Sequence, residues 1–183
     1  MFENKARLRE KFSKIRKEVA FRDEKNCKIT EKVIQLLLEK SPSSVFAYVS
    51  FGSEVDTKLL ITRLFSERKV FVPHTALGEM QAVRLTDLDK LFFVDKKGNV
   101  YAENEERLER EDSPSVTIVP MLAFSKDLYR LGYGGGYYDK FLSKTNTYKI
   151  GLAYDEQLTD ELTNEAHDER LDCIVTPSMI YRR

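Results

Sequence analysis

The segment that most constrains the fold is a short apolar run, Val116-Thr117-Ile118-Val119-Pro120. Its first four residues are all β-branched, which favours an extended strand over a helix. Strands without polar alternation occur mainly in parallel sheets that are covered on both faces. The run therefore predicts the central strand of a sheet that is enclosed by helices.

Helical and extended patterns alternate along the rest of the chain. A first helix is indicated by apolar residues at helical spacing: Leu8, Phe12, Ile15 and Val19. Asp23 and Asp56 are expected to cap a second and a third helix. The other elements expected are strands over 45–49, 70–73, 148–153 and 171–176, and a helix over 137–142. This order predicts the α/β class, as a single-domain three-layer α/β/α sandwich over residues 1–183 with a largely parallel sheet.

Composition narrows the function classes. The 30 basic residues balance the 30 acidic ones, which gives no electrostatic reason to expect nucleic-acid binding. The two cysteines, Cys27 and Cys173, and the two histidines, His74 and His167, are far apart in sequence, so a structural zinc site is not expected. No apolar run is long enough for a signal peptide or a membrane span, and we expect a cytoplasmic protein without a membrane partner.

A glycine-rich loop follows the central strand, with the sequence Arg130-Leu131-Gly132-Tyr133-Gly134-Gly135-Gly136-Tyr137-Tyr138-Asp139. Glycines let the backbone approach a ligand closely, and successive N–H groups in such a loop can bind an anion. Arg130 adds a forked cation suited to phosphate. The loop is neither a P-loop nor a dinucleotide-binding fingerprint, because no Gly-Lys-Ser/Thr follows and Tyr137 replaces the last glycine. The alternative is a tight connection whose tyrosines pack on the sheet.

This loop resembles the hallmark motif of the 5-formyltetrahydrofolate cyclo-ligase family. Further segments resemble that family in the same order: Lys5-x-x-x-Arg9, Ser50 to Thr57, Val119-Pro120 with Ala123-Phe124, Gly151 to Gln157, and His167-Asp168. Two positions depart from the family pattern, since Ser125 replaces a common Asp and Leu128 a common Gly. The resemblance implies ATP-dependent closure of 5-formyltetrahydrofolate to 5,10-methenyltetrahydrofolate, with release of ADP and phosphate.

The resemblance also implies which residues act. The catalytic positions are Arg130, Tyr133 and Asp139. The ATP-binding positions are Lys5, Arg9, Arg130, Leu131, Gly132, Tyr133, Gly134, Gly135, Gly136, Tyr137 and Tyr138. The folate-binding positions are Val49, Glu54, Tyr133, Gly134, Gly135, Gly136 and Tyr137. Asp139 and Asp168 are the positions for Mg²⁺, so we expect their carboxylates within roughly 4–8 Å of each other.

Other interpretations stay open at this point. Lys5 and Arg9 belong to a helix with further basic residues, Lys11, Lys14, Arg16 and Lys17, and the whole set can be a solvated face. A phosphate-binding protein of the sugar-phosphate isomerase or CoA-transferase type would use the loop without turning over ATP. A single-stranded nucleic-acid module is opposed by the zero net charge, and a non-catalytic folate sensor by the intact motif. The favoured reading is a monomer that acts on 5-formyltetrahydrofolate, with or without a polyglutamate tail.

Overall fold

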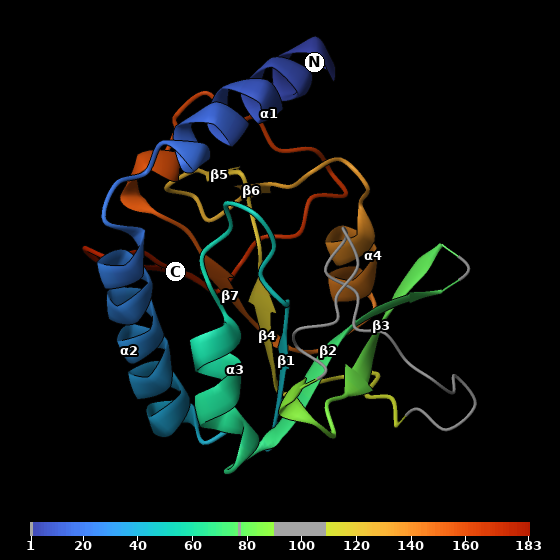
Figure 1. Cartoon of the computed structure of the whole chain (residues 1–183). Coiled ribbons are helices and arrows are strands. Elements are labelled where there is room, and N and C mark those ends of the chain that lie inside the picture. The colour runs from blue at the N-terminus through green and yellow to red at the C-terminus, as the bar shows by residue number, and fades with distance from the viewer. Residues whose placement is uncertain (1, 77, 90–108) are drawn as a thin grey trace.

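The computed structural model describes residues 2–76, 78–89 and 109–183, and a seven-stranded sheet runs through this part of the chain (Figure 1). In sheet order the strands are β3 (Glu79–Arg84), β2 (Lys69–Ala76), β1 (Ser44–Ala47), β4 (Val116–Val119), β7 (Tyr148–Leu152), β8 (Cys173–Val175) and β9 (Ile180–Arg182). The five inner strands are parallel, and the two edge strands pair antiparallel with their neighbours. The predicted largely parallel sheet is confirmed, with β4 at its centre.

Helices cover the sheet on both faces. They are α1 (Phe2–Lys17), α2 (Arg22–Lys40), α3 (Lys58–Phe65) and α4 (Tyr137–Ser143). Figure 1 shows α2 and α3 on one side of the sheet, α4 on the other, and α1 across the end near the short strands β5 (Ala123–Phe124) and β6 (Arg130–Leu131). Within the described residues, no helix combines the length and apolar character needed to cross a bilayer.

The core lies on both sides of β4. Ile118 belongs to the apolar cluster beneath α2 and α3, whereas its neighbour Val119 belongs to the cluster that includes Phe141 and Leu142 of α4. Adjacent residues of a strand point to opposite faces, so one strand contributes to both clusters. This burial explains why the run 116–119 lacks polar alternation.

Both predicted helix caps are wrong in their position. The residue that precedes α2 is Phe21, which has a left-handed backbone (φ 54°), and Asp23 lies inside the first turn. The other cap is displaced by one residue, because α3 begins at Lys58 after Thr57. Asp56 still acts on that helix, since its Oδ1 accepts a hydrogen bond from the Lys58 N–H at 2.8 Å.

Helix α1 packs against segments that are distant in sequence. Leu8 and Phe12 are buried with Leu122 and Leu131 in a small apolar cluster. On the solvent side, the Arg7 and Lys11 side chains each form an ion pair of 2.6 Å with the Glu161 carboxylate. These contacts place the basic residues of α1 beside the glycine-rich loop, which follows β6 directly.

Candidate active site

The glycine-rich loop connects β6 to α4, and Arg130 fixes its first end. The Arg130 side chain is buried, and its Nη1 and Nη2 nitrogens both lie 3.0 Å from Asp139 Oδ1 in the first turn of α4. This ion pair joins the two ends of the loop. Arg130 Nε is also buried, and no acceptor among the described residues pairs with it.

Arg9 lies against the same loop. Its Nε donates a hydrogen bond to the Gly132 carbonyl at 3.1 Å, and no described residue accepts a hydrogen bond from its two Nη nitrogens. Gly134 has φ +102°, and a Cβ atom there would lie 3.3 Å from Arg9 Cζ. A side chain at residue 134 would therefore be strained by its backbone and crowded by Arg9. Helix α1 thus places a cation against the loop, and no described residue occupies its outer nitrogens.

Lys5 lies between two carboxylates on the late segment. Its Nζ is 2.8 Å from Asp168 Oδ2 and 3.1 Å from Glu165 Oε2. Burial acts to lower the pKa of Lys5, but its hydrogen bonds to Asp168 and Glu165 outweigh burial and raise it. Burial likewise favours the neutral form of Asp168, yet the hydrogen bond from Lys5 lowers the pKa of that carboxyl. Both partners are therefore charged at neutral pH.

The structure brings Asp139 and Asp168 to one end of the fold. Asp139 Oδ1 accepts a hydrogen bond of 3.3 Å from the N–H of Glu169, the residue next to Asp168. Each carboxylate keeps one oxygen that accepts no hydrogen bond from a described residue: Oδ2 of Asp139 and Oδ1 of Asp168. Carboxylate oxygens of this kind suit Mg²⁺. These two residues therefore fit the implied metal.

Asp168 also belongs to a cluster with Glu165 and His167, and of these three residues only Glu165 was not singled out from the sequence. Single ligand atoms of Glu165, His167 and Asp168 lie within 4.8 Å of one another. His167 Nε2 is 3.2 Å from Glu165 Oε2, but the imidazole is largely exposed. The Lys5 ammonium contacts both carboxylates of the group, which supplies positive charge there.

The predicted folate residues gather on the other side of the loop. Tyr133 donates its hydroxyl proton to Glu54 Oε1 at 2.7 Å, and the Phe51 N–H donates to Glu54 Oε2 at 2.9 Å. Burial raises the pKa of Glu54, and the hydrogen bonds from Tyr133 and Phe51 act in the opposite direction. Val49 is buried in the core below this loop, where its side chain can form only a wall.

Two residues of the predicted ATP set have packed side chains. Leu131 is buried against α1, and Tyr138 stacks on Phe46 with ring centroids 6.2 Å apart. The Tyr138 hydroxyl is buried and has no hydrogen-bond partner in the described part of the chain. Leu131 can meet a ligand at the loop only through its backbone, whereas the Tyr138 side chain is half-buried. Tyr137, in contrast, turns its ring toward a pocket on the outer side of α4.

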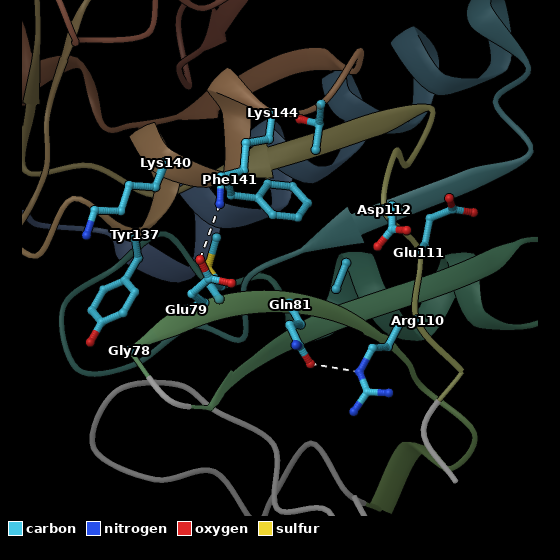
Figure 2. A pocket seen from close by; sticks show the side chains of 13 residues that line it. Gly78, Glu79, Gln81, Arg110, Glu111, Asp112, Tyr137, Lys140, Phe141 and Lys144 are labelled. Carbon is cyan, nitrogen blue, oxygen red and sulfur yellow. Dashed lines mark hydrogen bonds and ion pairs between the residues drawn. The ribbon is translucent and has the colours of Figure 1, made fainter. Parts of the chain in front are cut away.

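That pocket has a volume of about 280 Å³ and lies between α4 on one side and β3 with residues 110–112 on the other (Figure 2). Two interactions cross it or line it: Lys144 Nζ to Glu79 Oε1 at 3.2 Å, and Arg110 Nε to Gln81 Oε1 at 2.8 Å. Its charged lining residues balance in sign: Lys140, Lys144, Arg110, Glu79, Glu111 and Asp112. The pocket adjoins the loop through Tyr137. Because its basic and acidic residues balance, the lining favours neither an anionic nor a cationic ligand.

Arg16 is the residue that sequence reasoning missed, because it was grouped with the solvated basic residues of the first helix. Its side chain is only 4% exposed, and its Nη2 donates to the Tyr133 hydroxyl oxygen at 2.6 Å. The signal was in the helical phase. At about 100° per residue, Arg16 lies between Lys5 and Arg9 around the helix axis, whereas Lys14 lies on the opposite side from Lys5.

The two departures from the family pattern leave the turn before β6 closed. Leu128 adopts φ +68°, a left-handed conformation that glycine accepts more readily than leucine. Its N–H donates to the Ser125 carbonyl at 3.0 Å, its carbonyl accepts from the Leu171 N–H at 3.0 Å, and its side chain is buried. Packing of the leucine thus offsets a backbone strain of about 1 kcal/mol.

Comparison with known proteins gives a consistent result. The sequence model of the 5-formyltetrahydrofolate cyclo-ligase family matches residues 2–177. An Escherichia coli (strain K12) protein named 5-formyltetrahydrofolate cyclo-ligase is 33% identical over 147 residues, which cover 75% of this chain and 80% of that protein. A mouse protein of the same name is 29% identical over 159 residues, covering 79% of this chain and 78% of the relative.

A solved structure shares the fold over nearly the whole chain. The NMR structure of Aquifex aeolicus 5,10-methenyltetrahydrofolate synthetase superposes with a TM-score of 0.83 at 27% identity, covering 97% of this chain and 92% of that one. The family match, the relatives and the superposition agree with the motif order along the sequence. The chain belongs to the 5-formyltetrahydrofolate cyclo-ligase family.

Proposed function

We propose that this protein catalyses the ATP-dependent cyclisation of 5-formyltetrahydrofolate to 5,10-methenyltetrahydrofolate, with release of ADP and phosphate. The observation that carries the proposal is the two-sided glycine-rich loop. Arg9 lies on it with two Nη nitrogens that pair with no described residue, and Tyr133 of the same loop is hydrogen-bonded to the half-buried carboxylate of Glu54. One loop therefore joins a cationic surface suited to phosphate with a carboxylate suited to a heterocycle.

The reaction consists of two substitutions. In the first, the γ-phosphoryl group moves to the formyl oxygen: a P–O bond forms to that oxygen, the bond to the β-phosphate oxygen breaks, and ADP leaves. In the second, N10 attacks the formyl carbon, the carbon–oxygen bond to phosphate breaks, and the N10 proton passes to solvent. Neither step needs a protein nucleophile, so the main task of the protein is to position the reactants and neutralise charge.

The cations of the site match that task. Arg9 and the loop backbone would hold the polyphosphate, and Arg130 would keep the loop closed through Asp139. Lys5 contacts Asp168 and Glu165 at the same end of the fold, where it balances their charge. Asp139 and Asp168 would hold Mg²⁺ through the oxygens that accept no hydrogen bond from a described residue, Oδ2 of Asp139 and Oδ1 of Asp168, the latter 3.9 Å from His167 Nε2. The ion would supply positive charge to the phosphates when bound.

Glu54 is suited to the pterin ring. A carboxylate accepts paired hydrogen bonds from adjacent N–H groups, and each Glu54 oxygen has a further lone pair besides the one used by Tyr133 or Phe51. The Tyr133 ring is 55% exposed beside this carboxylate and offers an aromatic surface. We expect the protein to act in the cytoplasm, as a monomer, on folate with or without a polyglutamate tail.

The experiment that tests the function follows the near-ultraviolet absorbance of the methenyl product. Purified protein with ATP, magnesium and 5-formyltetrahydrofolate should produce it, and omission of ATP or of divalent metal should abolish it. Release of ADP should also require folate, which separates this activity from the isomerase or transferase alternative. Folded protein that forms no product under varied metal and folate conditions would refute the proposal.

Replacing Glu54 by glutamine should weaken folate binding more than ATP binding. The change keeps one acceptor but removes the charge that a pterin N–H edge would contact, so we expect the KM for 5-formyltetrahydrofolate to rise about tenfold or more. The KM for ATP should change less than about twofold. Steady-state kinetics with each substrate varied in turn measures both values.

Glu10→Gln is the matched control, because Glu10 is exposed on α1 and, among the described residues, its side chain pairs with Lys14 alone. This variant should behave as the wild type. A rise in the KM for ATP with an unchanged KM for folate would show that Glu54 serves the other ligand.

A further inference from the structure

Arg16 differs from the other basic residues near the end of α1 in its burial. Its side chain is almost completely enclosed, whereas the Lys14 side chain is 69% exposed and forms an ion pair with Glu10. Enclosing a guanidinium removes it from water, which is costly unless each donor finds an acceptor. The burial of Arg16 is therefore explained only if nearby segments provide acceptors for its guanidinium nitrogens.

Each nitrogen of the Arg16 guanidinium contacts a different segment. Nε donates to the Ser53 hydroxyl at 3.0 Å, Nη1 to the Met121 carbonyl at 2.9 Å, and Nη2 to the Tyr133 hydroxyl at 2.6 Å. Ser53 precedes Glu54, Met121 follows β4, and Tyr133 belongs to the glycine-rich loop. One planar group thus holds three loops at fixed relative positions.

The contact with Tyr133 also fixes the direction of a hydrogen bond. Arginine has donors only, so the Tyr133 oxygen accepts from Arg16 and its own proton is free to point elsewhere. That proton is donated to Glu54 Oε1 at 2.7 Å. The two hydrogen bonds therefore run in one direction, from Arg16 to Tyr133 and from Tyr133 to Glu54. The remaining lone pairs of Glu54 can still accept hydrogen bonds from a ligand.

We propose that Arg16 is a positioning residue for the folate substrate, which holds Tyr133 and Glu54 in their binding arrangement without touching the substrate itself. This inference rests on the proposed function, because it gives Glu54 and Tyr133 the folate. The arrangement needs such a support: the Tyr133 ring is largely exposed, and glycines at 132 and 134 flank it. Without Arg16, both side chains would have to be ordered by the ligand at an entropic cost.

The test compares binding of the two substrates to an Arg16→Met variant. Methionine fills similar space but has no donors, so we expect the Kd for 5-formyltetrahydrofolate, measured by calorimetry without ATP, to rise about 10- to 100-fold. The Kd for ATP should change less than about threefold. Arg16→Lys keeps the charge but lacks the fork, and should recover part of the folate affinity. Lys14→Met removes a charge from the same helix and should leave both values unchanged.

A double-mutant cycle separates positioning from general damage to the fold. Tyr133→Phe removes only the hydroxyl group and leaves Arg16 buried. This variant therefore tests the contact between the two residues even if Arg16→Met does not fold. If Arg16 acts through Tyr133, the effects of Arg16→Lys and Tyr133→Phe on folate affinity should be clearly less than additive. Fully additive effects, or equal losses of ATP and folate affinity, would overturn the inference.

The wild-type protein distinguishes this inference from the proposed function. If wild-type protein forms no methenyl product, the function itself fails. If it forms the product while Arg16→Met and Arg16→Lys bind folate normally, only the role of Arg16 fails.

Discussion

Replacing Asp139 by asparagine should lower turnover by about 100-fold, the order of loss seen when one charge-stabilising group is removed from a transition state. Asparagine has the same shape and keeps an oxygen that can accept from Arg130 Nη1 and Nη2 and from the Glu169 N–H. It replaces the oxygen that is free for a metal by an amide NH₂ group, which cannot ligate Mg²⁺. The concentration of magnesium needed for half-maximal rate should therefore rise.

The fold should survive this change. Arg130 is left without its closest counter-charge, but Asp168 and Glu169 also place negative charge near its guanidinium. The decisive measurement is a magnesium titration of the rate of methenyl formation, accompanied by a thermal melt. Asp127→Asn is the matched control, since this exposed aspartate lies in the turn before Arg130 and should be silent. An unchanged magnesium requirement would remove Asp139 from the metal site.

Replacing Gly151 by valine should reduce the free energy of unfolding by about 3 kcal/mol, because this position in β7 has no room for a side chain. A Cβ atom at residue 151 would overlap Cε of Met121, and would lie 2.7 Å from Leu171 Cδ1 and 3.2 Å from Ile174 Cγ1. Met121 can rotate away, but Leu171 and Ile174 are themselves buried and close the other sides. Valine then adds two further methyl groups.

Thermal unfolding followed by circular dichroism should show the loss as a Tm lowered by about 10 °C. Gly132→Val provides the comparison, because no atom lies within 4 Å of a Cβ built there and its backbone is not left-handed. Only stability is compared, since residue 132 belongs to the loop. Equal melting temperatures for the two variants would mean that the packing around β7 yields more easily than its contacts indicate.

The sheet could be predicted from the sequence because its strands are short apolar runs between turn signals. The edge strands β3 and β9 and the paired two-residue strands β5 and β6 were not anticipated. A strand of two residues has no periodicity to detect, and its pairing depends on segments that are distant in sequence. The cap of α2 was misplaced because Phe21 has a left-handed backbone, which is uncommon for a bulky residue and is not indicated by the sequence.

The glycine-rich loop of the candidate site was easier to predict from the sequence than the basic residues of α1. Glycine spacing marked the loop itself, but basic residues on α1 cannot be told from a solvated face by composition alone. Lys5 and Arg9 were chosen by family resemblance, and Arg16 was missed. The helical phase placed all three on one side, yet only the packing of α1 over Leu122 and Leu131 decides that this side is enclosed.

The contacts of α1 with residues 161–168 have a consequence for biosynthesis. Lys5 and Asp168 are separated by 163 positions, and Arg7 and Glu161 by 154. These two contacts can therefore form only after residues 161–168 have been synthesised, long after α1 itself. Leu8 and Phe12 likewise remain exposed to solvent until their apolar partners Leu122 and Leu131 have been synthesised. Contacts of such long range also slow folding, so we expect α1 to dock late in the folding of this domain.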